Sequence, residues 1–312
     1  MSLNKKSIAG MSFSGGKKEN YFFCLMEYYP NEQRWFLKTL DQVKEARSQS
    51  EDEIFKTWIE KNNVDELVVN FPLTETMCKR CQLDCPGENA CIHPEVKDVR
   101  DEIEKLLEED QSLVATNPKK YEQERVEDNK VHFTRTVLDK ETTDHILSKS
   151  FKRKLKKGFT PYWNRPVDFW IWKNYYDQLL KLFGISYDSY GNTSVMLLHK
   201  VEYLSRHFPQ KLSLMESDVY IVLIELYRAG TIQLKTLKEL QSIDLNTLAR
   251  VKIIRAIEKR LNIFIYNHDL ELMSKNQKAF DSFLLAIAGQ NYLEKKSTIN
   301  SVEKSFIFPH FA

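Results

Sequence analysis

The sequence predicts a mixed α/β fold from the order of its first five elements. Three strand-like apolar runs, at residues 7–13, 21–29 and 34–40, are separated by stretches of turn-forming residues. A stretch with apolar residues at helical spacing (51–63) follows, and then a short buried strand at 67–71. This order predicts two hairpin-joined strands, a third edge strand, and a parallel strand that is reached through a crossover helix.

The remainder of the chain reads as mainly helical, so we expect flanking helices and helical elaboration around the sheet. Helical patterns cover 96–110, 167–185, 194–208, 219–230, 247–263 and 277–293, and a further strand is expected at 211–217. Ser50 is the expected N-cap of the 51–63 helix. We expect a single domain over residues 1–312, with a cysteine metal loop at 78–91 and a variable insertion at about 111–150 that contains some strand at 130–138.

Composition is that of a folded protein and names no partner. Hydrophobic residues make up 42% of the 312 residues and aromatic residues 12%, which argues against a disordered chain. The 46 basic residues nearly balance the 44 acidic ones, so only local charge can indicate a ligand. The first apolar stretch is too short for a signal peptide, and no run of ~18 apolar residues predicts a membrane span. We expect a cytoplasmic protein.

Four motifs, in chain order, carry a resemblance to a known family. They are "AGMSFSGGK" at the first strand, "LVVNFPL" at the fourth, "LMES" at 214–217 and "KAFDSFLLAIAG" at 278–289. Together with the strand order they resemble the predicted RNase H-like nucleases of the domain of unknown function 429 family, over about residues 7 to 290. The resemblance implies an RNase H-like mixed sheet and a nuclease site that holds Mg²⁺ or Mn²⁺ on acidic residues.

The chain departs from this family pattern at two of four acidic positions. By resemblance, Glu216 and Asp281 match a later glutamate and a helical aspartate, whereas Ser12 and Asn70 stand where aspartates are expected. Two-metal phosphodiester hydrolysis needs carboxylates that offset the charge of two divalent ions. One charge pair at about 4 Å contributes roughly 4 kcal/mol at an effective dielectric of about 20, before desolvation is counted. The losses therefore predict an inactive or impaired site, and a single-metal site on Glu216 and Asp281 stays open.

Four of the five cysteines form a second candidate site. Cys78, Cys81, Cys85 and Cys91 have the spacing C-x₂-C-x₃-C-x₅-C. A reducing cytoplasm disfavours disulfides, so metal binding is the first interpretation. Four thiolates suit a closed structural Zn²⁺ site, and a 4Fe-4S cluster is the alternative because it also takes four cysteines. His93 can replace one cysteine, and Cys24 is expected in the core.

A basic stretch stands before a dense aromatic group. Lys152, Arg153 and Lys154 lie in the run "SKSFKRKLKK", and clusters of this kind attract phosphates. The alternative is a solvated segment that leads into a helix whose aromatic residues are core. By resemblance, Arg165 in "FTPYWNRP" is the arginine of a family motif and a candidate phosphate or substrate contact.

Three functions remain open from the sequence. The first is an RNase H-like protein with a degenerate site that binds nucleic acid, or a protein partner, through its cleft and metal loop. The second is an active divalent-metal-dependent nuclease that uses Glu216 and Asp281. The third is a zinc-stabilised interaction scaffold without a nucleic-acid role. Whether the chain is an enzyme, and whether it dimerises, is not readable from the sequence.

Overall fold

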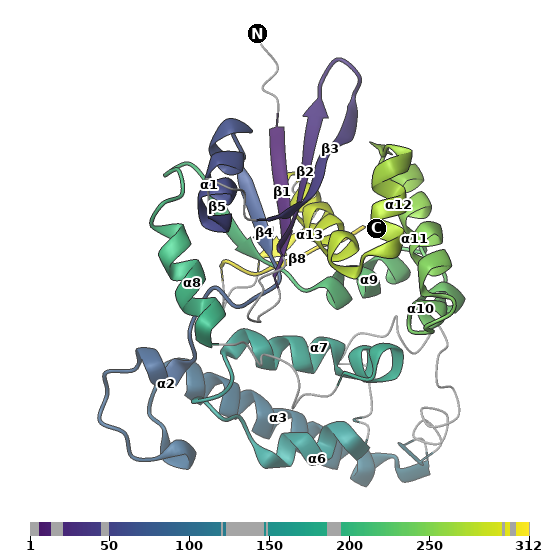
Figure 1. The fold of residues 1–312 in the computed structure, drawn as a ribbon. Helices are drawn as coiled ribbons and strands as arrows, with labels where there is room; N and C mark the ends of the chain where they lie inside the picture. Colours follow the sequence, from purple (N-terminus) through teal and green to yellow (C-terminus); the bar gives the residue numbers. More distant parts are fainter. Residues whose placement is uncertain are drawn as a thin grey trace. The chain divides into compact units, whose positions relative to one another are not determined.

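A computed structural model describes residues 6–13, 21–44, 50–119, 121–122, 147, 149–185, 195–294, 297–299 and 304–311. The chain divides into two compact units. Unit 1 contains residues 1–73 and 193–312, and unit 2 contains residues 74–192. Figure 1 shows both units, which are treated separately below. Among the described residues, no helix combines the length and the apolar character needed to cross a membrane.

Unit 1 is built on a six-stranded mixed sheet with the order β5-β4-β1-β2-β3-β6. The strands are β1 (Lys6–Ser12), β2 (Tyr21–Tyr29), β3 (Arg34–Val43), β4 (Glu66–Val69), β5 (Ser213–Glu216) and β6 (Ile263–Phe264). β2 is antiparallel to both β1 and β3, whereas β4 is parallel to β1, β5 to β4, and β6 to β3. β1 therefore occupies the middle of the sheet and is buried except at its first residue.

One face of the sheet is covered by α13 (Gln277–Leu293), which lies behind β1 and β4 in Figure 1. Glycines allow the helix and the sheet to approach closely. A Cβ added at Gly10 would lie 2.0 Å from the backbone oxygen of Ser282, and one at Gly289 would lie 2.6 Å from a methyl group of Ile8. Ser282 thus packs on Gly10 and Gly289 on Ile8, so α13 runs antiparallel to β1. Its N-terminal end lies toward the carboxyl end of β1.

The opposite face carries α1 (Glu51–Lys61) and α8 (Val195–Ser205), which share one apolar cluster with β1, β2 and β4. Ser50 caps α1 as predicted: its hydroxyl accepts from the N–H of Glu53 at 3.3 Å, and the Glu53 carboxylate accepts from the N–H of Ser50 at 2.9 Å. This reciprocal capping box satisfies two donors that the first helical turn leaves unpaired.

Additional elements complete unit 1 after β5. They are α9 (Val219–Arg228), α10 (Leu234–Leu240), α11 (Asn246–Arg260), α12 (Asn267–Lys275), β7 (Thr298–Ile299) and β8 (Ile307–Phe308). β7 and β8 form a small antiparallel pair, and Phe306 adds a parallel bridge to Glu216 at the end of β5. The C-terminal segment therefore contacts the strand end where the sequence predicts a site.

Unit 2 is helical in its described residues. Its elements are α2 (Met77–Arg80), the 3₁₀ turn η1 (Glu88–Ala90), α3 (Pro94–Thr116), α6 (Lys149–Lys157) and α7 (Pro166–Phe183). α3, α6 and α7 pack on a shared cluster that includes Phe151, Phe169, Trp172 and Tyr176. The dense aromatic group after the basic run is thus largely core. Gly184, at φ 65°, ends α7 in the left-handed conformation that glycine tolerates best.

Most predicted elements are confirmed to within a few residues, but the third strand is not the expected edge strand, because β6 pairs with the outer side of β3. The predicted helix at 96–110 extends to Thr116, which lies inside the expected insertion at 111–150. Most of that insertion, with the strand expected at 130–138, lies outside the described residues. The structure confirms a mixed α/β architecture. An RNase H-like fold is a more specific assignment and stays a prediction.

Candidate functional site

Three of the four sequence-predicted acidic-site positions lie at neighbouring strand ends in unit 1. Ser12 is the last residue of β1, Asn70 follows β4, and Glu216 is the last residue of β5. The register aligns Met11 with Val69, and Val69 with Glu216. Because β1, β4 and β5 are parallel, their carboxyl ends meet at one edge of the sheet, where open α/β sheets bind ligands.

Two of these side chains are engaged by backbone donors. The Oδ1 of Asn70 accepts a 3.0 Å hydrogen bond from the N–H of Phe13, directly after Ser12. The Oε2 of Glu216 accepts a 3.0 Å hydrogen bond from the N–H of Leu73. Ser12 and Glu216 are both buried. These polar side chains therefore hold the ends of β1, β4 and β5 together.

The fourth predicted acidic-site position, Asp281, lies on α13. It lies in the first turns of this helix, whose N-terminal end packs toward the carboxyl end of β1. Its Oδ1 accepts a 2.7 Å hydrogen bond from the side chain of Gln277. Burial raises the pKa of Asp281 to about 7, and the negative charge of Asp218 adds to this effect, while Gln277, Arg250 and Lys278 oppose it.

Asp218 is a carboxylate that the sequence interpretation did not single out. It stands two residues after Glu216 and caps α9, where its Oδ1 accepts from the N–H groups of Tyr220 and Ile221 at 2.8 and 3.1 Å. Its negative charge raises the pKa of Asp281, so these two acidic groups interact electrostatically. An aspartate directly before an apolar helical run is an N-cap signal, and that signal could have identified it.

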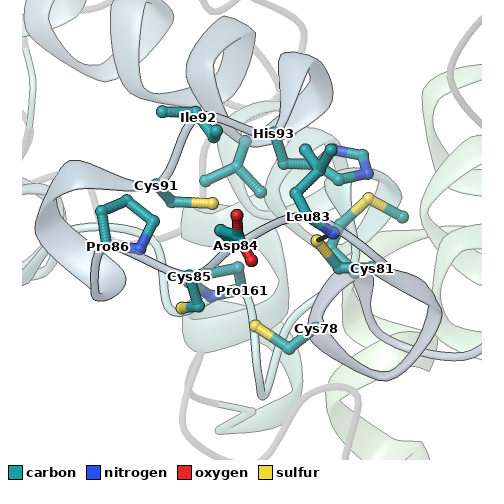
Figure 2. Close-up of a pocket in the computed structure, with 12 residues that line it drawn as sticks. Cys78, Cys81, Leu83, Asp84, Cys85, Pro86, Cys91, Ile92, His93 and Pro161 are labelled. Atoms are coloured by element: carbon teal, nitrogen blue, oxygen red, sulfur yellow. Dashed lines mark hydrogen bonds between the residues drawn. The ribbon is translucent and has the colours of Figure 1, made fainter.

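The cysteine loop of unit 2 forms the second candidate site (Figure 2). All four predicted cysteines line one pocket: Cys78, Cys81, Cys85 and Cys91. The sulfur atoms surround the pocket in Figure 2, and His93 and Asp84 also line it. The loop is anchored at both ends. The N–H of Cys78 donates to the carbonyl of Pro161 at 3.2 Å, and Arg100 of α3 donates to the carbonyl of Cys91 at 2.6 Å.

The donor set in this pocket suits a thiophilic cation. Burial raises the pKa of the Cys78 thiol, and the charges of Cys91, Cys85 and Cys81 raise it further, so the thiols are close enough to oppose one another's ionisation. The N–H of Leu83 donates to the sulfur of Cys81 at 3.4 Å. The buried Nδ1 of His93 has no hydrogen-bond partner among the residues that the structure describes. A bound cation would offset the charge repulsion between thiolates.

The described residues contain no ready-made metal cage. No three or more of the described histidine, cysteine, aspartate and glutamate side chains form a group that could hold an ion as they stand. This holds for the strand-end edge and for the cysteine pocket. Metal binding at either place therefore stays a prediction. At the cysteine pocket it has the support of four lining thiols and one unpartnered imidazole nitrogen.

Arg165 lies in the interior of unit 2, only 3% exposed. Its Nη2 donates to Asp168 Oδ1 at 2.9 Å, its Nε to Asp168 Oδ2 at 3.3 Å, and its Nη1 to the Thr74 hydroxyl at 3.3 Å. The fork-shaped pair holds the start of α7. A phosphate or substrate contact through Arg165 stays a prediction.

The basic run forms α6, with one cation engaged and another exposed. Lys152 pairs with the buried Asp110 of α3, whereas Arg153 is exposed and Lys154 is half-buried. Phe151 and Leu155 anchor the apolar side of this helix in the core of unit 2. α6 therefore combines a packed face with a cationic one, and its role in anion binding stays a prediction.

No family model, curated protein or solved structure matches this chain. A function can therefore be inferred only from the residues and their arrangement.

Proposed function

We propose that unit 1 has an RNase H-like fold with a degenerate, impaired metal site and that the protein binds nucleic acid. The strand arrangement carries this proposal. β1, β2 and β3 form an antiparallel meander, and β4 and β5 follow in parallel beside β1, in the order β5-β4-β1-β2-β3. That is the arrangement expected of the RNase H-like core. Three of the positions named by the family resemblance, Ser12, Asn70 and Glu216, lie at the carboxyl ends of β1, β4 and β5, and the fourth, Asp281, lies in the first turns of α13.

The side chains at this edge favour an impaired metal site over one that supports two-metal catalysis. Ser12 and Asn70 supply neutral oxygens, and Mg²⁺ is held in proteins chiefly by carboxylates. Asn70 and Glu216 each already accept a backbone hydrogen bond. Burial raises the pKa of Asp281 to about 7 in the metal-free chain, so near neutral pH a cation at Asp281 competes with a proton. Each of these features weakens the hold on a divalent cation.

An assay of nucleic-acid binding and cleavage tests this proposal. Wild-type protein and Asp281→Asn are incubated with single- and double-stranded DNA, RNA, hybrids and branched junctions, with Mg²⁺ or Mn²⁺. We expect binding that weakens linearly with the logarithm of salt concentration, and no cleavage. Mn²⁺-dependent cleavage that Asp281→Asn abolishes would establish the alternative, an active nuclease. Absence of any salt-dependent binding would favour the zinc-stabilised scaffold.

The cysteine pocket supports a second candidate function, a structural Zn²⁺ site. Cys78, Cys81, Cys85 and Cys91 would hold the ion, with His93 able to replace one of them. Zinc in a closed four-ligand site supplies folding free energy and leaves no position open for water. The ion would cross-link α2 and η1, which are only four and three residues long, to the segment just before α3.

Metal analysis of the purified chain distinguishes zinc from an iron–sulfur cluster. We expect one Zn²⁺ per chain, lost in Cys81→Ser and retained in the control Cys24→Ala, whose thiol is buried in β2. Iron with visible absorbance would establish the 4Fe-4S alternative. Loss of zinc in Cys24→Ala as well would indicate a different site.

A further inference from the structure

A ladder of aromatic side chains crosses three adjacent strands of unit 1. Its rings belong to Tyr29, Phe36, Phe264, Tyr266 and His268, and we call this set the aromatic ladder. Consecutive ring centroids are 5.1, 5.4, 4.9 and 5.6 Å apart. The ladder connects the end of β2, the start of β3 and β6 with the start of α12. Rings that come from such distant parts of the sequence form one continuous surface.

The ladder lies on the face of the sheet opposite α13. Trp35 donates a hydrogen bond to Glu294, just after α13, at 3.1 Å, and side chains alternate along a strand, so Phe36 points to the other face. α1 covers part of that face by packing Phe55 and Trp58 on Phe23. Tyr29 lies six residues beyond Phe23, about 20 Å along the strand.

The outer rings of the ladder are open to solvent. Tyr29 is 38% and Tyr266 48% exposed, and the His268 side chain is 78% exposed. Tyr266 and His268 are stacked with an interplanar angle of 24°. Large exposed aromatic groups of this kind mark interaction sites more often than single exposed apolar residues do.

A cation that has no carboxylate partner among the described residues, Arg34, accompanies the rings. The Arg34 guanidinium lies 5.3 Å from the centroid of Phe264 and donates to the carbonyl of Ile263 at 3.1 Å. A guanidinium has five N–H donors, and among the described residues only the carbonyl of Ile263 accepts from Arg34, whose Nε is buried. Nearby, Lys38 pairs with Glu27, and the His268 side chain contacts Asp269. Arg34 therefore places a positive charge beside the rings.

We propose that the aromatic ladder is a stacking platform for single-stranded nucleic acid, with Arg34 facing the backbone phosphates. This inference deepens the proposed nucleic-acid function and rests on it. Flat exposed rings beside a cation are the combination by which proteins hold unpaired bases. The surface lies at the opposite end of the sheet from Ser12, because β1 pairs its first residues with the end of β2 and its last with the start. Single strands would thus bind away from the candidate metal edge.

Binding of labelled oligo(dT) and oligo(U) to the full chain, followed by fluorescence anisotropy, tests the platform. Tyr266→Ala should weaken single-strand binding about tenfold to a hundredfold, because one stacking contact is lost. Tyr266→Phe keeps the ring and should bind within about twofold of wild type. Tyr203→Ala is the matched control, since Tyr203 is 53% exposed and also contacts a histidine, His207, but lies on α8. Arg34→Gln should reduce the slope of the logarithm of the binding constant against the logarithm of salt concentration, by the contribution of about one phosphate contact.

Three results would overturn this inference. Equal binding by Tyr266→Ala and wild type would exclude the ladder as the platform while leaving the proposed nucleic-acid function intact. Absence of binding by wild type itself would remove both. A change in oligomeric state caused by Tyr266→Ala without nucleic acid would identify the ladder as an interface between copies of the chain.

Discussion

The side chain of Asn70 ties the end of β4 to the end of β1 by accepting a 3.0 Å hydrogen bond from the N–H of Phe13. This contact lies beside Ser12, at the edge where the two parallel strands end. An aspartate at position 70 could accept the same hydrogen bond and also offer a charged oxygen to a cation. The asparagine keeps the structural contact and lacks the charge.

Removal of this acceptor should destabilise unit 1 modestly. In Asn70→Ala the N–H of Phe13 loses its partner in a partly buried place, so we expect a loss of about 1 kcal/mol in the free energy of unfolding. Asn70→Asp retains an acceptor and serves as the control. Urea unfolding measures both variants, and equal stability of Asn70→Ala and wild type would contradict the role given to this bond.

The two glycines between α13 and the sheet should differ in their tolerance of a methyl group. At Gly10 the added Cβ meets backbone atoms of Ser282 and Ala286 at 2.0 and 2.4 Å, which cannot move without displacing the helix. At Gly289 it meets side-chain methyl groups of Ile8 and Val68. We expect Gly10→Ala to lower stability by about 3 kcal/mol or more, and Gly289→Ala by less. Thermal unfolding of both variants measures the two losses of stability. A smaller loss in Gly10→Ala than in Gly289→Ala would contradict this prediction.

Glu66 should make the stability of unit 1 depend on pH. Burial raises its pKa from 4.5 to about 7, with the charge of Asp65 adding to the effect, and its buried Oε2 has no hydrogen-bond partner. The folded protein holds this proton more tightly than the unfolded chain. The resulting stabilisation is therefore full below about pH 4.5 and is lost as the pH rises through about 7.

The neutral variant Glu66→Gln should remove this dependence. At pH 8 we expect it to exceed wild type by about 2 kcal/mol in unfolding free energy, and at pH 4 to match it. Urea unfolding at both pH values provides the comparison. Asp281→Asn, measured alongside, removes the contribution of another carboxyl group whose pKa is raised to about 7. An unchanged pH profile in Glu66→Gln would show that Glu66 titrates near its ordinary pKa.

Arg165 should act mainly on the stability of unit 2. Arg165→Ala leaves Asp168 buried without its cationic partner, and loss of one member of such a pair costs about 3–5 kcal/mol. Arg165→Lys keeps the charge but loses the fork geometry, so it should recover only part of the stability. The midpoint of urea unfolding distinguishes the three proteins. A normal midpoint in Arg165→Ala would indicate that the pair does not hold the start of α7.

Much of the architecture could be predicted because local sequence patterns determine it. Turn-forming residues bound the first three strands, and Ser50 with Glu53 marks the start of α1. The close approach of α13 to β1 could not be predicted in this way, because it joins Gly10 to Ser282 across most of the chain. β6 has only two residues, too few for any periodicity to appear.

In the candidate sites, too, local features could be predicted and features that depend on tertiary packing could not. Because four cysteines fall within fourteen residues, their proximity could be predicted, and all four line one pocket. The aromatic ladder could not be predicted, since Phe36 and Phe264 become neighbours only when β6 pairs with β3. The capping role of Asp218 is local and could be predicted from the sequence. Its interaction with Asp281 could not, because it depends on tertiary packing.

Manganese binding by the full chain tests the central claim most directly. Mn²⁺ prefers oxygen ligands, so its electron paramagnetic resonance signal reports the strand-end edge and not the thiol pocket. We expect wild type to leave Mn²⁺ free, and Asn70→Asp and Ser12→Asp/Asn70→Asp to bind it with increasing affinity. Tight binding by wild type that Asp281→Asn abolishes would contradict the account and show that the site at the ends of β1, β4 and β5 is intact.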